Sequence, residues 1–175
     1  PPPRTALACW LAIFVSQFAF AAEKVYQQPA DFLAEFMPGC KQQVLWLKSE
    51  ARAEIEKLLE RTYPGVRVRF CDDDGRTAWI LDEIGKTEPI TTGVIVEGGV
   101  VERVRVLVFR DSRGGEVHRE AFVRQYEQAS LQDDSRLDRR IDGITGATLS
   151  VSALNRQVQL ALLLDRLARG NLHDS

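Results

Sequence analysis

The chain has 175 residues, of which 45% are hydrophobic and 27% are charged. This length suits one domain with its own core, and the mixture of apolar and charged residues excludes a disordered or collagen-like chain. The 23 Lys and Arg residues nearly balance the 25 Asp and Glu residues, and two His and three Cys residues are too few for a multi-metal protein. We therefore expect no nucleic-acid partner and no metal site.

The N-terminal segment has the features of a secretory signal peptide. Arg4 precedes an apolar run from Ala6 to Ala22, and Ala19-Phe20-Ala21 supplies a small-x-small cleavage site. We expect residues 1–21 to be removed and the mature protein to be periplasmic or otherwise extracytoplasmic. An uncleaved N-terminal membrane anchor is the alternative, although two polar residues interrupt the apolar run.

Two cysteines, Cys40 and Cys71, remain in the expected mature chain. In an exported protein they can form a disulfide, provided that their Cα atoms lie within about 7 Å of each other. The sequence does not fix that distance, so a pair of free thiols is an equal alternative. Neither residue belongs to a Cys-x-x-Cys pair, and we expect neither to be catalytic.

Residues 22–64 are predicted to form an N-terminal helical segment. A short helix is expected over Asp31–Met37, because a Pro-Gly pair follows it directly. Trp46 lies in a brief apolar stretch, and we expect it in the core. A second helix follows from Ser49 with apolar residues at helical spacing, and Tyr63-Pro64-Gly65 stops it.

The middle of the chain predicts antiparallel strands. Apolar residues between turn signals indicate four of them: Val66–Phe70, Thr77–Leu81, Thr91–Val96 and Val100–Arg110. The turns within the two successive pairs contain Asp74-Gly75 and Gly98-Gly99, which are strong hairpin signals. In the last strand, Val104, Val106 and Val108 are expected to share one face of the sheet.

Helices are expected again towards the C-terminus. Glu120–Gln128 is a candidate for a short helix, and Val151–Leu167 has the most regular apolar stripe in the chain. Strands grouped between helices predict an α+β fold rather than a parallel sheet with crossover helices. We expect a single domain with a mainly antiparallel central sheet and flanking helices.

A loop of small residues, from Asp142 to Ser150, precedes the last helix. The start of a helix has free N–H groups and the positive end of the helix dipole, and both suit a phosphate. Gly143 and Gly146 would allow the backbone to approach such a ligand closely. Ordinary loop and helix-capping chemistry is the alternative, and the segment is neither a P-loop nor a dinucleotide-binding fingerprint.

The segment Asp142-Gly143-Ile144-Thr145-Gly146-Ala147-Thr148 resembles the Asp-x-x-Ser/Thr-Gly-Ala-Thr flavinylation motif. This motif belongs to the FMN-binding domain family, which includes the C subunit of sodium-pumping NADH:quinone oxidoreductase and the G subunit of Rnf-type complexes. The resemblance implies that Thr148 carries FMN through a phosphoester bond made from FAD by a magnesium-dependent FMN transferase. Asp142, Thr145, Gly146 and Ala147 would serve recognition and loop shape.

The resemblance covers roughly Arg76–Leu167, and the predicted FMN-binding domain spans residues 65–170. Two other segments contribute to it, Gly85–Gly93 and Arg113–Glu116. The residues that we expect to contact the isoalloxazine ring are Lys86, Thr87, Glu88, Arg113 and Glu116. For each of them, a solvent-exposed loop residue without a role is the alternative.

The resemblance implies an exported flavoprotein that carries electrons between membrane or periplasmic redox partners. No catalytic residue is predicted, because the sequence contains no nucleophilic triad and the flavin itself supplies the redox chemistry. Two alternatives remain. One is a non-catalytic binding or assembly module of a membrane redox complex, and the other is a free-standing reductase of a small substrate.

Overall fold

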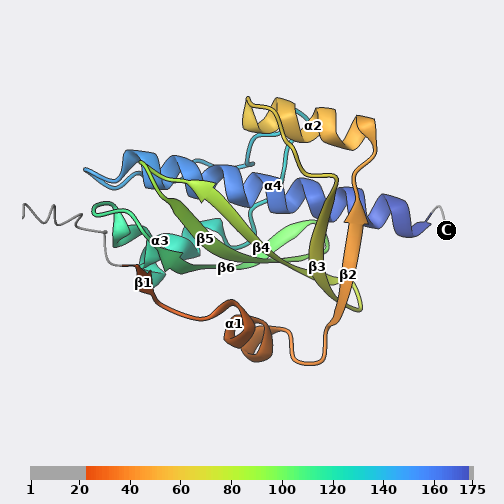
Figure 1. Cartoon of the computed structure of the whole chain (residues 1–175), viewed down its shortest axis with the longest axis horizontal. Coiled ribbons are helices and arrows are strands. Elements are labelled where there is room, and N and C mark those ends of the chain that lie inside the picture. Colours follow the sequence, from red (N-terminus) through yellow and green to blue (C-terminus); the bar gives the residue numbers. More distant parts are fainter. Residues whose placement is uncertain (1–22, 174–175) are drawn as a thin grey trace, which may run out of the picture.

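The computed structural model describes residues 23–173, so the predicted signal segment 1–21 lies outside the described part of the chain (Figure 1). The elements follow one another as β1 (Lys24–Val25), α1 (Pro29–Phe36), β2 (Lys41–Trp46), α2 (Ser49–Leu59), β3 (Arg67–Asp73), β4 (Arg76–Ile84), β5 (Pro89–Glu97), β6 (Val100–Phe109), the 3-10 helix η1 (Gly115–His118), α3 (Glu120–Val123), the 3-10 helix η2 (Arg124–Tyr126) and α4 (Thr148–His173). Among these residues, no helix has the length and apolar character needed to cross a membrane.

The strands form one six-stranded sheet in the order β1-β6-β5-β4-β3-β2, and every neighbouring pair is antiparallel. This arrangement confirms the predicted α+β fold with an antiparallel central sheet. The segment 22–64, predicted as helical, contains α1 and α2 but also supplies both edge strands, β1 and β2. The sequence did not predict these two strands, because β1 has only two residues and β2 begins with three polar residues.

The two predicted hairpin turns are confirmed. Asp74 and Gly75 have φ angles of 46° and 95°, and Gly98 and Gly99 have φ angles of 59° and 81°. Positive φ at both central residues is the signature of a type I′ turn, whose twist matches that of the flanking strands. These two turns fold β3 through β6 into consecutive hairpins.

Helices cover both faces of the sheet (Figure 1). The larger core lies between the sheet and α4, with α2 beside α4, and includes Trp79, Val94 and Leu154, which are fully buried. A smaller core lies under α1 on the opposite face, where the Phe32 ring packs over Gly93. A Cβ atom at position 93 would lie 2.6 Å from a ring carbon of Phe32, so this close packing needs glycine.

The prediction that Val108 shares a face with Val104 and Val106 is wrong. Thr92 pairs with Val106 while Thr91 pairs with Val108, so β6 has one extra residue, Leu107, at this point. Such a bulge reverses the alternation of side chains beyond it. Val108 therefore packs in the small core under α1, whereas Val104 and Val106 belong to the large one.

The prediction that Trp46 lies in the core is also wrong, because its side chain is 60% exposed. Trp46 ends the edge strand β2, and the guanidinium of Arg67 on the neighbouring strand lies 5.8 Å from the centre of its ring. An edge position leaves such a side chain only one neighbouring strand to pack on. Trp79, on the central strand β4, is fully buried and stacks on Phe70 at a ring distance of 4.6 Å.

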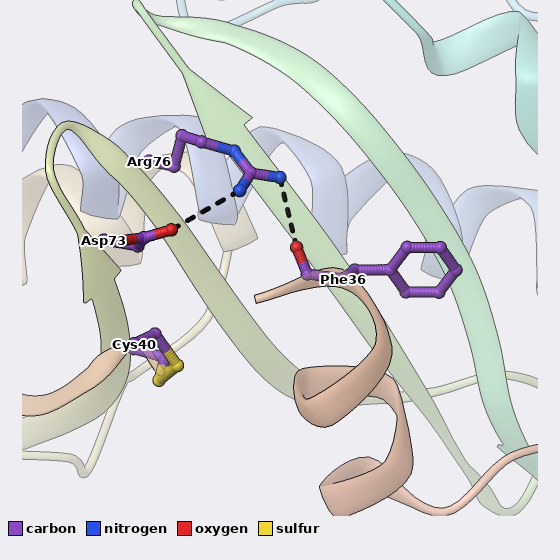
Figure 2. The surroundings of a disulfide bond; sticks show 5 residues. Phe36, Cys40, Asp73 and Arg76 are labelled. Carbon is purple, nitrogen blue, oxygen red and sulfur yellow. Dashed lines mark hydrogen bonds and ion pairs between the residues drawn. A yellow bond between two sulfur atoms is a disulfide. The ribbon is translucent and has the colours of Figure 1, made fainter. Parts of the chain in front are cut away.

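Cys40 and Cys71 form a disulfide, with their Cα atoms 5.6 Å apart, which settles the two alternatives left by the sequence (Figure 2). The bond ties the segment after α1 to β3. Arg76 strengthens the same attachment, because its guanidinium donates a hydrogen bond of 3.2 Å to the carbonyl of Phe36 at the end of α1. Its ion pair with Asp73, at 3.5 Å, lies within the β3–β4 hairpin. The small core is thus closed by covalent and polar links.

A buried amide joins α4 to the sheet. The Nε2 group of Gln157, which is 1% exposed, donates to the carbonyls of Leu81 and Ile90 at 2.8 Å each. Its Oε1 atom accepts a hydrogen bond of 2.8 Å from the hydroxyl of Thr92. One side chain therefore satisfies three buried polar groups of β4 and β5.

We expect Gln157→Leu to lower the free energy of unfolding by about 2 to 4 kcal/mol, because buried groups left without a partner keep their desolvation cost. Gln159→Leu is the matched control, since Gln159 makes one partly buried hydrogen bond, to the carbonyl of Ser135. We expect that control to cost less than about 1 kcal/mol. Urea unfolding of both variants measures the difference, and equal costs would contradict the role given to Gln157.

Candidate cofactor site at the start of α4

Thr148 is the first residue of α4, and its side chain is exposed. The chain enters the helix through a turn in which the Ala147 N–H donates to the carbonyl of Ile144 at 2.9 Å, with Gly146 at a φ of 82°. The Ala147 carbonyl then accepts the first helical bond, from Val151, at 3.0 Å. The amides of residues 148–150 therefore have no partner within the helix and lie at its positive end.

A cavity of about 250 Å³ opens at this helix start. Its lining consists of Lys86, Arg113 and residues 146–150. Two cationic side chains, free amides and the Thr148 hydroxyl are the groups that bind a phosphate. The volume lies below the usual range for a whole drug-sized ligand, so the cavity fits a phosphate and its immediate attachment rather than a complete flavin.

The topology of the sheet explains why Lys86 and Arg113 line the same cavity. β5 and β6 form an antiparallel hairpin, so the loop that precedes β5 and the loop that follows β6 lie at the same end of the sheet. Lys86 belongs to the first loop and Arg113 to the second. The start of α4 lies at that end as well, which brings three segments distant in sequence to one cavity.

Gly114 allows the second loop to approach the helix. Its φ is 90°, and a Cβ atom there would collide with the hydroxyl of Ser150, which is 2% exposed. A side chain at position 114 would therefore push the loop carrying Arg113 away from α4. The sequence analysis did not assign this glycine to the site; its signal was the Gly114-Gly115 pair after a strand.

We expect Gly114→Ala to destabilise the protein by about 2 to 3 kcal/mol, from backbone strain and steric overlap together. Gly99→Ala is the matched control, because Gly99 also has a positive φ, 81°, but no neighbouring atom within 4 Å of the added Cβ. Chemical denaturation compares the two. A cost at position 114 no larger than that at position 99 would show that the close approach to Ser150 is unimportant.

Asp111 organises the loop that carries Lys86, and the sequence analysis missed it. Its carboxylate is 4% exposed and accepts hydrogen bonds from the main-chain N–H groups of Lys86, Thr87 and Glu88. Burial alone would raise the pKa of Asp111, but these bonds and one from the Thr87 hydroxyl outweigh it and hold the pKa below its ordinary value. The residue is thus a buried carboxylate that stays ionised.

Several predicted site residues do not line the cavity. Thr87 binds Asp111 through its main chain and its hydroxyl, and Glu88 binds it through its main chain alone. Glu116 lies instead near Tyr26, whose pKa is raised by burial and further by the charge of Glu116. Asp142, Gly143 and Thr145 are exposed on the loop before α4, where the Asp142 N–H donates to Gln125 at 2.8 Å.

A larger cavity of about 780 Å³ lies between α2 and α4 and is a weaker candidate. Its central carboxylate, Glu83, is 6% exposed and already pairs with Arg61 at 2.8 Å and with Arg156 at 3.1 Å. These paired charges stabilise the contact between the sheet and the helices. The cavity also contains no residue of the segment Asp142–Thr148.

A family model described as the FMN-binding domain matches residues 85–163. The matched range begins at the loop of Lys86, continues through β5 and β6, and ends within α4, so it contains every residue that lines the smaller cavity. No curated protein and no solved structure matches the chain.

Proposed function

We propose that this chain, whose residues 85–163 belong to the FMN-binding domain family, holds FMN covalently at Thr148 and carries electrons with it outside the cytoplasm. The family match supports a flavin-binding protein with FMN as its ligand. The covalent bond, the export and the electron-carrier role are our proposal. One observation carries it: Thr148 lines a small cavity together with Lys86 and Arg113 at a helix start.

The residues of the cavity have separate roles in this proposal. Lys86 and Arg113 balance the negative charge of the phosphoester, and the free amides at the start of α4 donate hydrogen bonds to its oxygens. Gly146 and Ala147 give the turn that exposes Thr148. When bound, FMN supplies the redox chemistry, and the protein contributes its binding, its orientation and the charge around it.

The exposed positions of Asp142, Gly143 and Thr145 suit recognition by another protein rather than contact with the phosphate. A transferase that makes the phosphoester from FAD, with magnesium as its cofactor, must reach the motif while Thr148 lies in the active site of the transferase. Exposed side chains on the same loop offer that access. We therefore propose that the transferase contacts these three residues when it binds the protein.

Export and a covalent cofactor belong together. A flavin held by non-covalent forces is lost by dilution outside the cytoplasm, whereas a phosphoester keeps it on the protein. The small volume of the cavity leaves the ring of the flavin near the surface, where a membrane or periplasmic redox partner can exchange electrons with it. Leu149, 53% exposed beside Thr148, gives the rim an apolar contact for the ring or the partner.

Expression with and without an FMN transferase tests this proposal. We expect the purified protein to gain the mass of one FMN group only with the transferase, and its yellow colour to survive denaturation. A protein that stays colourless with an active transferase would contradict the covalent bond and favour a non-catalytic assembly module. A colour that is lost on denaturation would show reversible FMN binding instead.

A further inference from the structure

Asp111 holds the loop of Lys86 by four hydrogen bonds. Its Oδ2 atom accepts from the Lys86 N–H at 2.7 Å, and its Oδ1 atom accepts from the Thr87 N–H at 3.0 Å, the Thr87 hydroxyl at 2.8 Å and the Glu88 N–H at 3.2 Å. A Cβ atom on Gly85 would lie 2.6 Å from Oδ2, so the carboxylate fits against bare backbone.

The loop has little else to define its shape. Within the turn itself, the Gly85 N–H donates to the carbonyl of Glu88 at 3.0 Å, while the side chains of residues 86–88 are exposed. Charge-assisted hydrogen bonds to a carboxylate are stronger than neutral ones, and three of these four come from successive main-chain amides. Asp111 therefore fixes the backbone from which Lys86 projects.

The contact leaves the charge of Lys86 available. Asp111 binds the main chain of Lys86, and within the described part of the chain no carboxylate lies within 4.0 Å of its ammonium group. The side chain lines the cavity with Thr148 and Arg113 instead. The loop thus presents an unpaired cation to the position where we place the phosphoester.

We propose that Asp111 is a positioning residue that holds Lys86 at the cavity of Thr148, and that through Lys86 it sets both the affinity of the cavity for phosphate and the reduction potential of the attached flavin. Only the effect on the reduction potential rests on the proposed function; the effect on phosphate affinity does not require a bound flavin. Asp111 does not line the cavity, and its hydrogen bond to the Lys86 N–H connects it to a residue that does.

A double-mutant cycle tests the inference without any flavin. Inorganic phosphate is titrated into wild type, Lys86→Met, Asp111→Asn and the double variant, and the amide NMR signals of residues 148–150 are followed. We expect the Kd for phosphate to rise about two- to fivefold in Lys86→Met, to rise in Asp111→Asn, and to rise no further in the double variant. Independent, additive effects would overturn the inference.

The flavinylated proteins give a second readout. Removing a positive charge near the flavin makes it harder to reduce, so we expect Lys86→Met to lower the midpoint potential. Asp111→Asn removes a negative charge, which by itself would raise the potential, so a lowered potential in this variant can come only from the displacement of Lys86. We expect that lowering, and we expect the double variant to fall no further than Lys86→Met. Asp165→Asn is the matched control. Asp165 is also a buried carboxylate, bound by Thr77 and Arg169, but it lies about 25 Å along α4 from Thr148.

We expect Asp165→Asn to lose stability with its potential unchanged. An Asp111→Asn protein with lowered stability and the wild-type potential and phosphate affinity would mean that Asp111 is merely structural. If Asp111→Asn does not fold, Thr87→Val replaces it in the cycle, because this variant removes one of the four bonds. If wild type never takes up FMN, the proposed function fails, and the phosphate cycle still decides the role of Asp111.

Discussion

A Thr148→Val variant is expected to fold normally and to leave coexpression with FMN transferase without covalent flavin. Valine keeps the shape of threonine and removes the hydroxyl that would form the phosphoester. Because Thr148 is exposed at the first turn of α4, we expect its free energy of unfolding to change by less than about 1 kcal/mol. Absorbance after denaturation and intact mass measure the loss, which should be complete.

Thr145→Val is the control for this experiment. Thr145 belongs to the same loop and also carries an exposed hydroxyl, but it does not line the cavity. We expect this variant to keep its covalent flavin, although the rate of transfer can fall if the transferase recognises position 145. Flavin that remains attached to the Thr148→Val protein would show that another residue carries it and would contradict our assignment.

The second large effect concerns the disulfide. Replacing Cys40 and Cys71 together by Ser should lower the free energy of unfolding by about 3 to 4 kcal/mol, because the bond closes a loop between residues 31 positions apart and restricts the unfolded chain. Urea unfolding of oxidised wild type and the double variant measures this. Reducing agent should destabilise wild type and leave the variant unchanged.

The same variant should keep its covalent flavin. Cys71 packs in the small core under α1, whereas Ala147 at the cavity belongs to the large core on the other face of the sheet. Loss of flavin reduction in a well-folded double variant would contradict the purely structural role that we give to the disulfide. Unchanged stability would show that the α1 attachment depends on packing and on Arg76 instead.

Local signals in the sequence predicted those parts of the fold that depend on few residues. Asp74-Gly75 and Gly98-Gly99 define their own turns through backbone conformation, and the antiparallel sheet follows from them. The apolar stripe of Val151–Leu167 likewise predicted α4, which extends beyond it at both ends, to Thr148 and His173. The loop of small residues before this stripe was expected to lead into a helix start, and Thr148 is the first residue of α4.

The remaining features depend on contacts between distant segments. The extra residue Leu107 in β6 turns Val108 to the other face, and no local pattern marks such a bulge. Trp46 is exposed because its strand forms an edge of the sheet, which depends on the order of all six strands. Asp111 follows a strand, as many loop residues do. It can bind the main chain of the Lys86 loop only because β5 and β6 pair and bring the two loops together.

Peptide mass mapping after coexpression with the transferase tests the central claim most directly. Trypsin should release the peptide from Ile141 to Arg156, which contains the motif and the start of α4. We predict that this peptide carries one FMN group and that fragmentation places it on Thr148. An unmodified peptide from a protein exposed to an active transferase, or FMN found on another residue, would contradict the account.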